Sequence, residues 1–270
     1  MEVVMFPNAR RPGVGLPPRE ESLRPMLPQH ARNCPVLEAG SALGLLVYPP
    51  LEANEAFDIE FQGEGRYCFT FHMGSGATEW QPIARITVSL PLGGVGKTRE
   101  EVEILARGLP LTPDAARSLM RMFIVPEDLG TPAGAVTLRG TTNFKTPEGW
   151  DTVYTSVINN IERPVAPILV VRVETDWYAH DSEFRYVLQP GETISGARNM
   201  PIGQVFFVPR EPVTLRDCTD DELTAIRASK QEFAKAKAAV TQTTPHGLQY
   251  SPHYARQSRR RRFSLDSFKK

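Results

Sequence analysis

Alternation of apolar and polar residues with a period of two is the feature that most constrains this fold. Phe57–Phe61 reads Phe-Asp-Ile-Glu-Phe, and Tyr67–Met73 repeats the alternation with an aromatic face. Ile86–Leu90 shows it a third time. Successive side chains of a strand point to opposite faces, so each stretch predicts a strand with one buried face. The chain is therefore expected to consist mainly of half-buried β-strands.

Short apolar runs separated by Pro and Gly predict further strands. The 270 residues include 24 prolines and 20 glycines, which favours short strands and many turns. The strands do not alternate with long helices, as they would in a parallel sheet. We expect a mainly β fold, a β-sandwich or a cupin-like jelly roll, with a few peripheral helices. The further strands are predicted at Met1–Phe6, Gly44–Tyr48, Ala135–Phe144, Thr152–Ile158, Ile168–Glu174, Glu183–Leu188 and Gln204–Val208.

Helical patterns are few. Val36–Leu43 has the length of one or two turns. Arg99–Arg107 and Pro113–Phe123 combine helical apolar spacing with acidic first turns, and they are expected to interrupt the sheet. The run Thr219-Asp-Asp-Glu222 is a capping-box pattern that predicts an amphipathic helix ending near Val240. We expect that helix to pack on the outside of the sheet.

These patterns divide the chain into four parts. Residues 1–33 are expected to form an N-terminal strand and an extended arm rich in Pro and Arg. Residues 34–217 form the β-rich core domain, with an inserted helical segment near residues 93–132. Residues 218–240 form the C-terminal helix, and residues 241–270 form a basic, flexible tail.

Charge is unevenly distributed although the formal net charge is zero. Arg256–Lys270 contains seven basic residues and one acid. Such a tail can contact nucleic acid or an acidic partner, although short terminal charge runs are more often simply solvated. The residues expected to make the tail's contacts are Arg259, Arg260, Arg261 and Arg262.

Cysteine spacing and hydropathy predict the compartment. Cys34, Cys68 and Cys218 are too widely spaced for a Cys-x-x-Cys zinc or redox motif. Met1–Arg11 lacks the pattern of a signal peptide, and no apolar run approaches the roughly 20 residues of a membrane helix. We expect a cytoplasmic protein without a membrane span.

A glycine-rich stretch resembles part of a phosphate-binding loop. Gly93–Thr98 reads Gly-Gly-Val-Gly-Lys-Thr, so that Gly96, Lys97 and Thr98 match the end of a Walker A motif. Pro91 occupies the position of the first glycine of that motif, and proline removes a backbone donor. We expect a glycine turn between a strand and a short helix, with nucleotide binding as a minor alternative.

Metal ligands are sparse. The facial triad of a metal-dependent jelly-roll enzyme needs a His-x-Asp or His-x-Glu pair and a second His. The nearest match is the adjacent pair His180 and Asp181, with His72 as the third ligand. No Gly-x-Ser-x-Gly elbow predicts nucleophilic catalysis. We predict no cofactor, with a divalent metal as the alternative.

Five short blocks in the second part of the chain resemble a known family. They are Cys34-Pro35, Thr146-Pro-Glu-Gly-Trp150, Glu174-Thr-Asp-Trp177, Gln189-Pro-Gly-Glu192 and the run from Pro201 to Pro209. In this order they resemble an uncharacterised domain-of-unknown-function family of bacteria and phages. The chain has Arg139 where the family carries a His, and Met73–Pro132 has no counterpart in it. The family has no established activity, so the resemblance implies a β-rich fold.

The two tryptophan blocks suggest a candidate pocket. Trp150 and Trp177 can each cover the end of a strand, and the space between them would be edged by Arg139, Glu174 and Asp176. The more frequent role of such tryptophans is that of buried corner residues.

The absence of enzyme motifs decides the functional expectation. The chain is expected to be a non-enzymatic binding or assembly protein that is oligomeric and has a protein partner or associates with itself. The alternative is a cupin-like enzyme that acts on a small molecule or a peptide at the candidate pocket.

Overall fold

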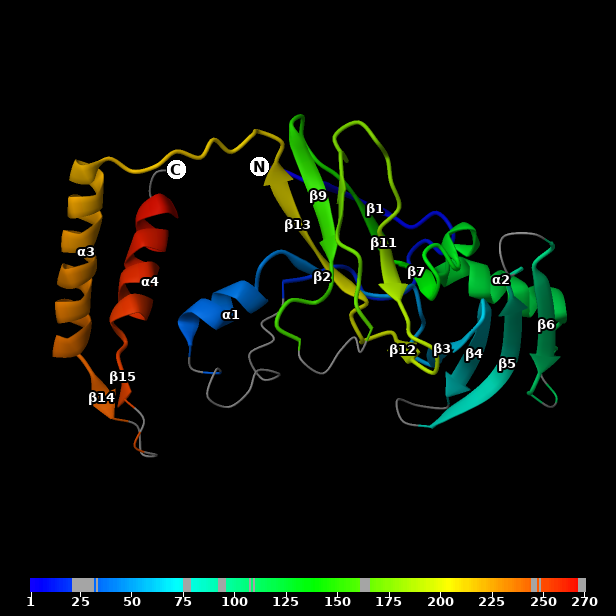
Figure 1. The fold of residues 1–270 in the computed structure, drawn as a ribbon. Helices are drawn as coiled ribbons and strands as arrows, with labels where there is room; N and C mark the ends of the chain where they lie inside the picture. The colour runs from blue at the N-terminus through cyan, green and yellow to red at the C-terminus, as the bar shows by residue number, and fades with distance from the viewer. Residues whose placement is uncertain are drawn as a thin grey trace. The chain divides into compact units, whose positions relative to one another are not determined.

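The computed structural model describes residues 1–20, 32, 34–74, 79–91, 96–106, 108, 110–160, 166–243, 247 and 249–266. Its contacts divide the chain into two units, Met1–Glu211 and Pro212–Lys270. The first unit includes the predicted N-terminal strand, and most of the predicted arm, residues 21–31 and 33, lies outside the described residues. It is mainly β, as expected, and its sheets are antiparallel (Figure 1).

The larger sheet of the first unit has the strand order β12-β3-β4-β5-β6. The predicted alternation decides which face is buried. Phe57, Ile59 and Phe61 are buried in β3, whereas Asp58 and Glu60 between them are partly exposed. The strands are β3 (Glu55–Gly63), β4 (Arg66–Gly74), β5 (Trp80–Ser89), β6 (Arg99–Ile104) and β12 (Thr193–Ala197).

A second sheet and two strand pairs complete the β structure of this unit. The four-stranded sheet has the order β10-β9-β13-β2, and the pairs are β11-β7 and β1-β8. The sheet consists of β2 (Leu45–Val47), β9 (Trp150–Thr155), β10 (Val171–Val173) and β13 (Gly203–Pro209). The pairs consist of β1 (Val4–Pro7), β7 (Ala135–Arg139), β8 (Thr142–Lys145) and β11 (Glu183–Val187).

The single strand expected over Ala135–Phe144 is wrong, because the chain breaks at Gly140 into β7 and β8. Gly140 lies where the chain crosses β2. A Cβ at Gly140 would come within 2.5 Å of Val47 Cγ1 and within 3.2 Å of Ser182 Cβ. Only a residue without a side chain allows this approach, and the two halves of the run then pair with different strands.

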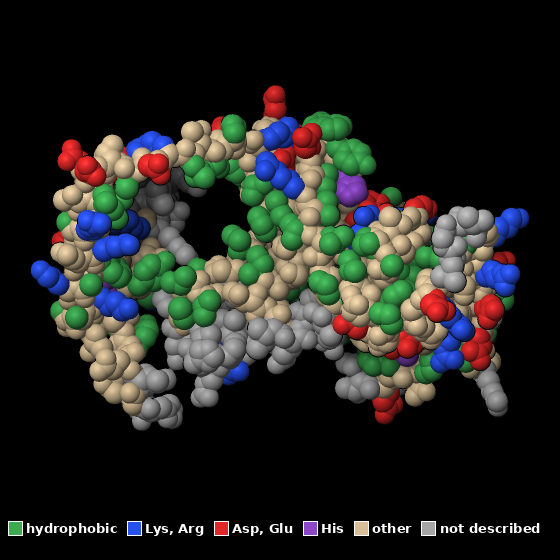
Figure 2. Space-filling model, in the orientation of Figure 1, with side chains coloured by type: hydrophobic (Ala, Val, Ile, Leu, Met, Phe, Trp, Pro, Cys, Tyr) green, Lys and Arg blue, Asp and Glu red, His purple; other side chains and the backbone are tan. Residues whose placement is uncertain are grey.

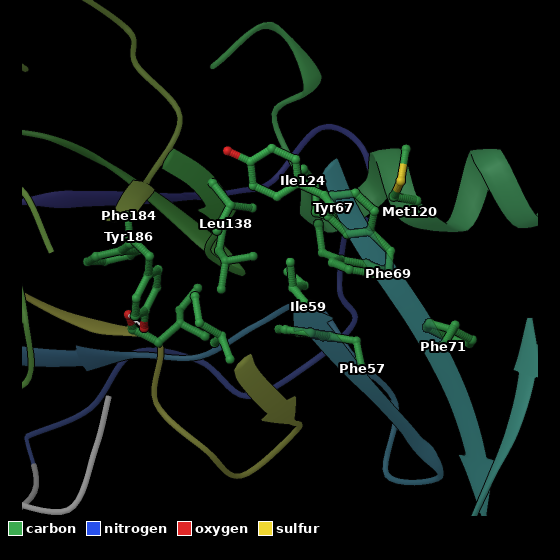
Figure 3. Packing of buried hydrophobic residues seen from close by; sticks show 14 of the residues in the cluster. Phe57, Ile59, Tyr67, Phe69, Phe71, Met120, Ile124, Leu138, Phe184 and Tyr186 are labelled. Atoms are coloured by element: carbon green, nitrogen blue, oxygen red, sulfur yellow. Dashed lines mark hydrogen bonds between the residues drawn. The ribbon is translucent and has the colours of Figure 1, made fainter. Parts of the chain in front are cut away.

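One hydrophobic core joins the sheets. Figure 3 shows side chains from β3, β4, β7, β11 and α2 (Pro113–Phe123) converging on a common interior. Helix α2 begins as predicted, with Thr112 as the N-cap and Pro113 in its first turn. It buries Met120 and Phe123, and the Phe123 ring stacks on that of Phe57 with centroids 4.8 Å apart. This arrangement is consistent with the predicted β-sandwich with few helices.

The helix expected over Arg99–Arg107 is wrong, because Arg99–Ile104 is strand β6. Its burial alternates: Glu100, Val102 and Ile104 are partly buried, and the residues between them are exposed. Pairing with β5 therefore outweighs the helix propensity of the glutamates. Short helices occur at α1 (Pro35–Ser41), as expected, and at η3 (Pro126–Asp128).

The second unit contains α3 (Asp220–Ala239), β14 (Gln242–Thr243), β15 (Gln249–Tyr250) and α4 (His253–Asp266). The predicted capping box is present, with reciprocal bonds between Thr219 and Glu222. Helix α3 is grouped with α4 in the second unit, and the expectation that it packs on the core sheet stays a prediction. The rings of Phe233 and His253 join the two helices with centroids 5.0 Å apart. The predicted flexible tail thus contains a helix.

None of the described helices is both long enough and apolar enough to cross a membrane. This finding agrees with the expectation that the chain has no helical membrane span.

Candidate functional site

Most of the predicted pocket residues lie on or beside one loop, residues 174–182, which connects β10 to β11. Its first half contains Glu174, Asp176 and Trp177 from the predicted pocket. Its second half contains His180 and Asp181 from the predicted metal site.

Hydrogen bonds fasten the first half of the loop to the turn before β9. Asp176 Oδ2 accepts a hydrogen bond from the backbone N–H of Gly149 over 3.0 Å. The hydroxyl of Thr175 lies 2.9 Å from that of Thr146 and 2.7 Å from that of Thr152, and all three threonines are buried. These bonds join the Thr-Pro-x-Gly-Trp block to the Glu-Thr-Asp-Trp block.

An ion network lies next to these bonds. Arg210 Nη2 lies 2.6 Å from Asp151 Oδ1 and 2.6 Å from Asp176 Oδ1. Arg172 Nε donates to the other oxygen of Asp151 over 2.6 Å. The Asp151 side chain is only 3% exposed, so both of its oxygens are paired where water has little access.

The pKa shifts show that this network is ionised at neutral pH. Burial alone would raise the pKa of Asp151, but the hydrogen bonds from Arg210 and Arg172 outweigh it and lower that pKa. The hydrogen bond from Arg210 lowers the pKa of Asp176 as well. These carboxylates are occupied by their arginines, so the network is suited to holding the loop rather than to transferring protons.

Sequence reasoning missed Asp151, Arg172 and Arg210. Asp151 carries a detectable signal, since it is an acid at the second position of the buried strand Trp-Asp-Thr-Val-Tyr-Thr. A buried charge requires a partner, and an arginine was to be expected nearby. The strand order that brings Arg210 next to Asp151 is not visible in the pattern.

Two aromatic side chains of the loop face solvent. Trp177 is 70% exposed and Tyr178 is 49% exposed. Trp177 Nε1 donates a hydrogen bond of 2.6 Å to Glu174 Oε2, which fixes the orientation of the indole. Trp177 is therefore not the buried corner residue that the sequence favoured. Trp150 is half-buried.

Aromatic rings connect this surface to the interior. The ring centroids of Trp177 and Tyr178 are 5.7 Å apart, and those of Tyr178 and His180 are 5.4 Å apart in a stacked arrangement. His180 meets the edge of Tyr154 at 6.2 Å, and Tyr154 is 1% exposed. The loop therefore places a continuous row of rings between solvent and the core.

Arg139 lies with the second half of the loop. Its guanidinium donates to the carbonyl oxygen of Ile124 over 2.5 Å, and its Nε lies 3.7 Å from Glu183 and 3.8 Å from Asp181. The structure records no contact of Arg139 with the Asp176 network among the described residues. The predicted pocket is thus divided between the two halves of the loop.

Three buried polar atoms beside this half have no hydrogen-bond partner among the described residues. They are Tyr154 Oη, Ser182 Oγ and Arg139 Nε. All three residues are at least nine-tenths buried. Arg139 Nε has only its longer ion pairs with Glu183 and Asp181, and buried polar groups without hydrogen bonds are costly, so this cluster is suited to receiving water or a polar ligand.

Two titratable groups of the second half have shifted pKa values. Burial raises the pKa of Glu183 to about 7, although nearby Arg139 acts in the opposite direction. Burial lowers the pKa of His180, against the opposing effect of Asp181 and Asp128. Glu183 therefore titrates near neutral pH, where a carboxyl group can accept or donate a proton.

The predicted metal ligands lie on different elements. His72 Nε2 lies 2.8 Å from Asp58 Oδ2 on the five-stranded sheet, whereas His180 and Asp181 lie on the loop. The part of the chain that the structure describes contains no group of three His, Cys, Asp or Glu residues that could hold a metal ion. The geometry thus gives the metal alternative no support.

The residues Gly96, Lys97 and Thr98 lead into a strand. They are exposed and precede β6, which runs antiparallel to β5 with Ser89 opposite Arg99. Phosphate binding by such a loop relies on backbone N–H groups at the start of a helix, and no helix begins here. The expected turn from strand to helix is wrong in its second half, and residues 92–95 lie outside the described part.

The basic residues predicted to make tail contacts lie on α4. Arg259, Arg260 and Arg261 are exposed there. The side chain of Arg262 lies outside the described part of the structure.

Comparison with known proteins leaves the site to be interpreted from its geometry. No protein-family model matches the chain, and a search of curated proteins finds no significant match. The resemblance to an uncharacterised bacterial and phage family therefore stays a prediction.

Proposed function

We propose that this chain is a non-enzymatic assembly protein that associates with further copies of itself through residues 169–178. The observation that supports this most strongly is the 70% exposure of Trp177 on a loop fastened by the Asp151–Arg210–Asp176 network. A rigid aromatic side chain loses little conformational entropy on binding, and Trp and Tyr are enriched among residues that dominate interface energies.

The same segment exposes further apolar side chains. Leu169 is 42% exposed, Val170 is 66% exposed and Val171 is 36% exposed. With Trp177 and Tyr178, five large apolar side chains within ten residues face solvent. Exposed apolar clusters of this kind are typical of protein interaction sites. A cytoplasmic location is part of the proposal, since Cys34, Cys68 and Cys218 are all free.

Sedimentation velocity of the full chain over a range of concentrations tests this proposal. We expect the wild-type chain to form a defined oligomer and the double variant Trp177→Ala/Val170→Ser to associate at least ten-fold more weakly. The matched control is Val213→Ser/Leu215→Ser, which removes two apolar side chains that are 84% and 89% exposed outside the segment. A wild-type chain that is monomeric throughout, or a control that weakens association equally, would contradict the proposal.

A second candidate function rests on the buried atoms of Tyr154, Ser182 and Arg139 beside Glu183. It is a cupin-like enzyme that acts on a small molecule or peptide at the second half of the loop, with Glu183 as the proton acceptor. Native mass spectrometry and elemental analysis of the purified chain test it. A bound small molecule lost in Tyr154→Phe, or a divalent metal lost in His180→Ala, would favour this candidate over the assembly protein.

A further inference from the structure

The two units carry opposite charges. Residues 1–211 contain 19 basic and 25 acidic residues, and residues 212–270 contain 12 basic and 6 acidic residues. The formal net charges are therefore −6 and +6. The neutrality of the whole chain conceals a strongly basic second unit.

The acids of the second unit are concentrated at the start of α3. Asp220, Asp221 and Glu222 lie in its first turn, where the helix dipole favours negative charge. Glu222 is also paired with Arg216 at 2.6 Å and caps the helix through Thr219. These carboxylates lie at the helix end, and Glu232 is the one acid among the basic residues further along α3.

The remaining cations of α3 and α4 are exposed, and the structure records no ion pair for any of them among its described residues. Figure 2 shows Lys and Arg side chains spread along the second unit and acidic side chains gathered at one end. The cations are Arg227, Lys230, Lys235 and Lys237 on α3 and Arg256, Arg259, Arg260 and Arg261 on α4.

Helical spacing aligns most of these cations. Arg227, Lys230 and Lys237 are three and seven residues apart, so they lie along one side of α3. Arg256, with Arg259 and Arg260, lies along one side of α4 by the same argument. Each helix therefore carries a row of unpaired positive charge.

The large apolar side chains exposed on the described part of the second unit lie on separate segments and include Val213 and Leu215 before α3, Ile226 on α3 and Tyr254 on α4. None of its described residues belongs to the buried core. The sequence of α4 is dominated by arginine and polar residues, with Tyr254, Phe263 and Leu265 as its large apolar residues, whereas a helix that lies in a membrane surface needs a continuous apolar face. The cations of α4 are all arginines, whose planar guanidinium matches a phosphate with two parallel hydrogen bonds.

We infer that the second unit binds the phosphate backbone of nucleic acid, without reading its sequence, through the arginine row of α4 and the basic row of α3. Neutralising phosphates releases counterions, so such binding weakens steeply with salt. This inference is independent of the assembly proposal, which concerns residues of the first unit.

Fluorescence anisotropy of the full chain with labelled oligonucleotides of mixed sequence tests the inference, in duplex and single-stranded form and over a series of salt concentrations. The test variant is Arg256→Gln/Arg259→Gln/Arg260→Gln. The matched control is Arg66→Gln/Lys97→Gln/Arg99→Gln, which removes three exposed cations from the first unit. Circular dichroism verifies that both variants keep the helix content of the wild type.

We expect the wild type and the control to bind equally and the test variant to bind at least ten-fold more weakly. The slope of log affinity against log salt should decrease by about 0.9 for each lost contact on duplex DNA, and by about 0.7 on a single strand. Three outcomes would each overturn the inference: no binding at low salt, an equal loss in both variants, or displacement by polyglutamate as effective as displacement by unlabelled DNA.

Discussion

Gly149 donates its backbone N–H to Asp176 across 27 residues of sequence. The bond closes the contact between the turn before β9 and the loop after β10. Gly149 has φ of 77°, which lies in the left-handed region. The turn geometry therefore favours glycine at this position, and the same turn presents the N–H to the carboxylate.

Replacing Gly149 by Ala should lower the free energy of unfolding by about 1 kcal/mol, because a Cβ is disfavoured at positive φ. Space is not the cause, since a Cβ here would meet no atom within 4 Å. Gly149→Asn is the matched variant and should lose less, because Asn tolerates this conformation. Urea denaturation measures both, and equal losses would show that backbone conformation is not the cause.

Replacing Asp151 by Asn should lower the free energy of unfolding by about 2 kcal/mol, because Arg172 and Arg210 lose a buried ionic partner. The control is Asp114→Asn, whose side chain is 93% exposed and whose pair with Arg117 should contribute less than about 0.5 kcal/mol. Urea denaturation at neutral pH compares the two. A loss as small as that of the control would mean that the network does not stabilise the loop.

The same network predicts that the stability of the folded chain depends on pH in the acidic range. The pKa of Asp151 is lower in the folded chain than its ordinary value of 3.8. Its stabilising contribution is therefore complete above that value and is lost as the pH falls through the lowered pKa. Thermal unfolding below about pH 4 should show a smaller difference between the wild type and Asp151→Asn than unfolding at pH 7.

Replacing Glu183 by Gln should stabilise the chain at alkaline pH. The folded pKa of about 7 exceeds the ordinary value of 4.5, so the folded state binds the proton more tightly. Stability is therefore lost as the pH rises between these values, and the uncharged variant avoids this loss. We expect a gain of about 2 kcal/mol at about pH 8 and almost none at about pH 4.

The control for this prediction is Glu103→Gln, whose side chain is 61% exposed. Because this side chain is exposed, the same change should alter the free energy of unfolding by less than about 0.5 kcal/mol at about pH 8. The pKa of nearby His180 is lowered by burial, so the measured quantity is the difference between wild type and variant. A difference that does not grow between about pH 4.5 and 7 would contradict a raised pKa of Glu183.

Replacing Phe123 by Ala should lower the free energy of unfolding by about 4 kcal/mol, because Phe123 is 3% exposed and stacks on Phe57. Phe123→Leu fills part of the space and should lose about 1.5 kcal/mol or less. Urea denaturation measures both variants. Equal losses would indicate that ring stacking, and not volume, is the property that holds α2 on the sheet.

Local sequence signals predicted the helices and strands whose formation depends on residues close by in the sequence. Pro113–Phe123 has the bounds of α2 because Thr112 caps it and Pro113 fits its first turn. The Thr219–Glu222 box marks the start of α3 for the same kind of reason. Strict alternation located β3 and β4, because a strand with one buried face has apolar residues at every second position.

Long-range contacts decide the remainder, and they are not visible locally. Arg99–Ile104 forms a strand only because β5 offers an edge, and the Thr193–Ala197 strand lies in a sequence with no strong strand pattern. At the site, the sequence analysis placed Asp176 and Trp177 in the same candidate pocket. It gave no means of knowing that Arg210 would pair with Asp176 or that Arg139 would join Glu183 instead.

The exposed stretch of residues 211–219 has a practical consequence for biochemistry on this chain. It separates a fragment with a formal net charge of −6 from a fragment with a formal net charge of +6. A protease that cuts at the start of this stretch converts a chain with a pI near 7.0 into two pieces of opposite chromatographic behaviour. At neutral pH an anion exchanger would retain one piece and a cation exchanger the other, so a single digest followed by two columns separates them without a tag.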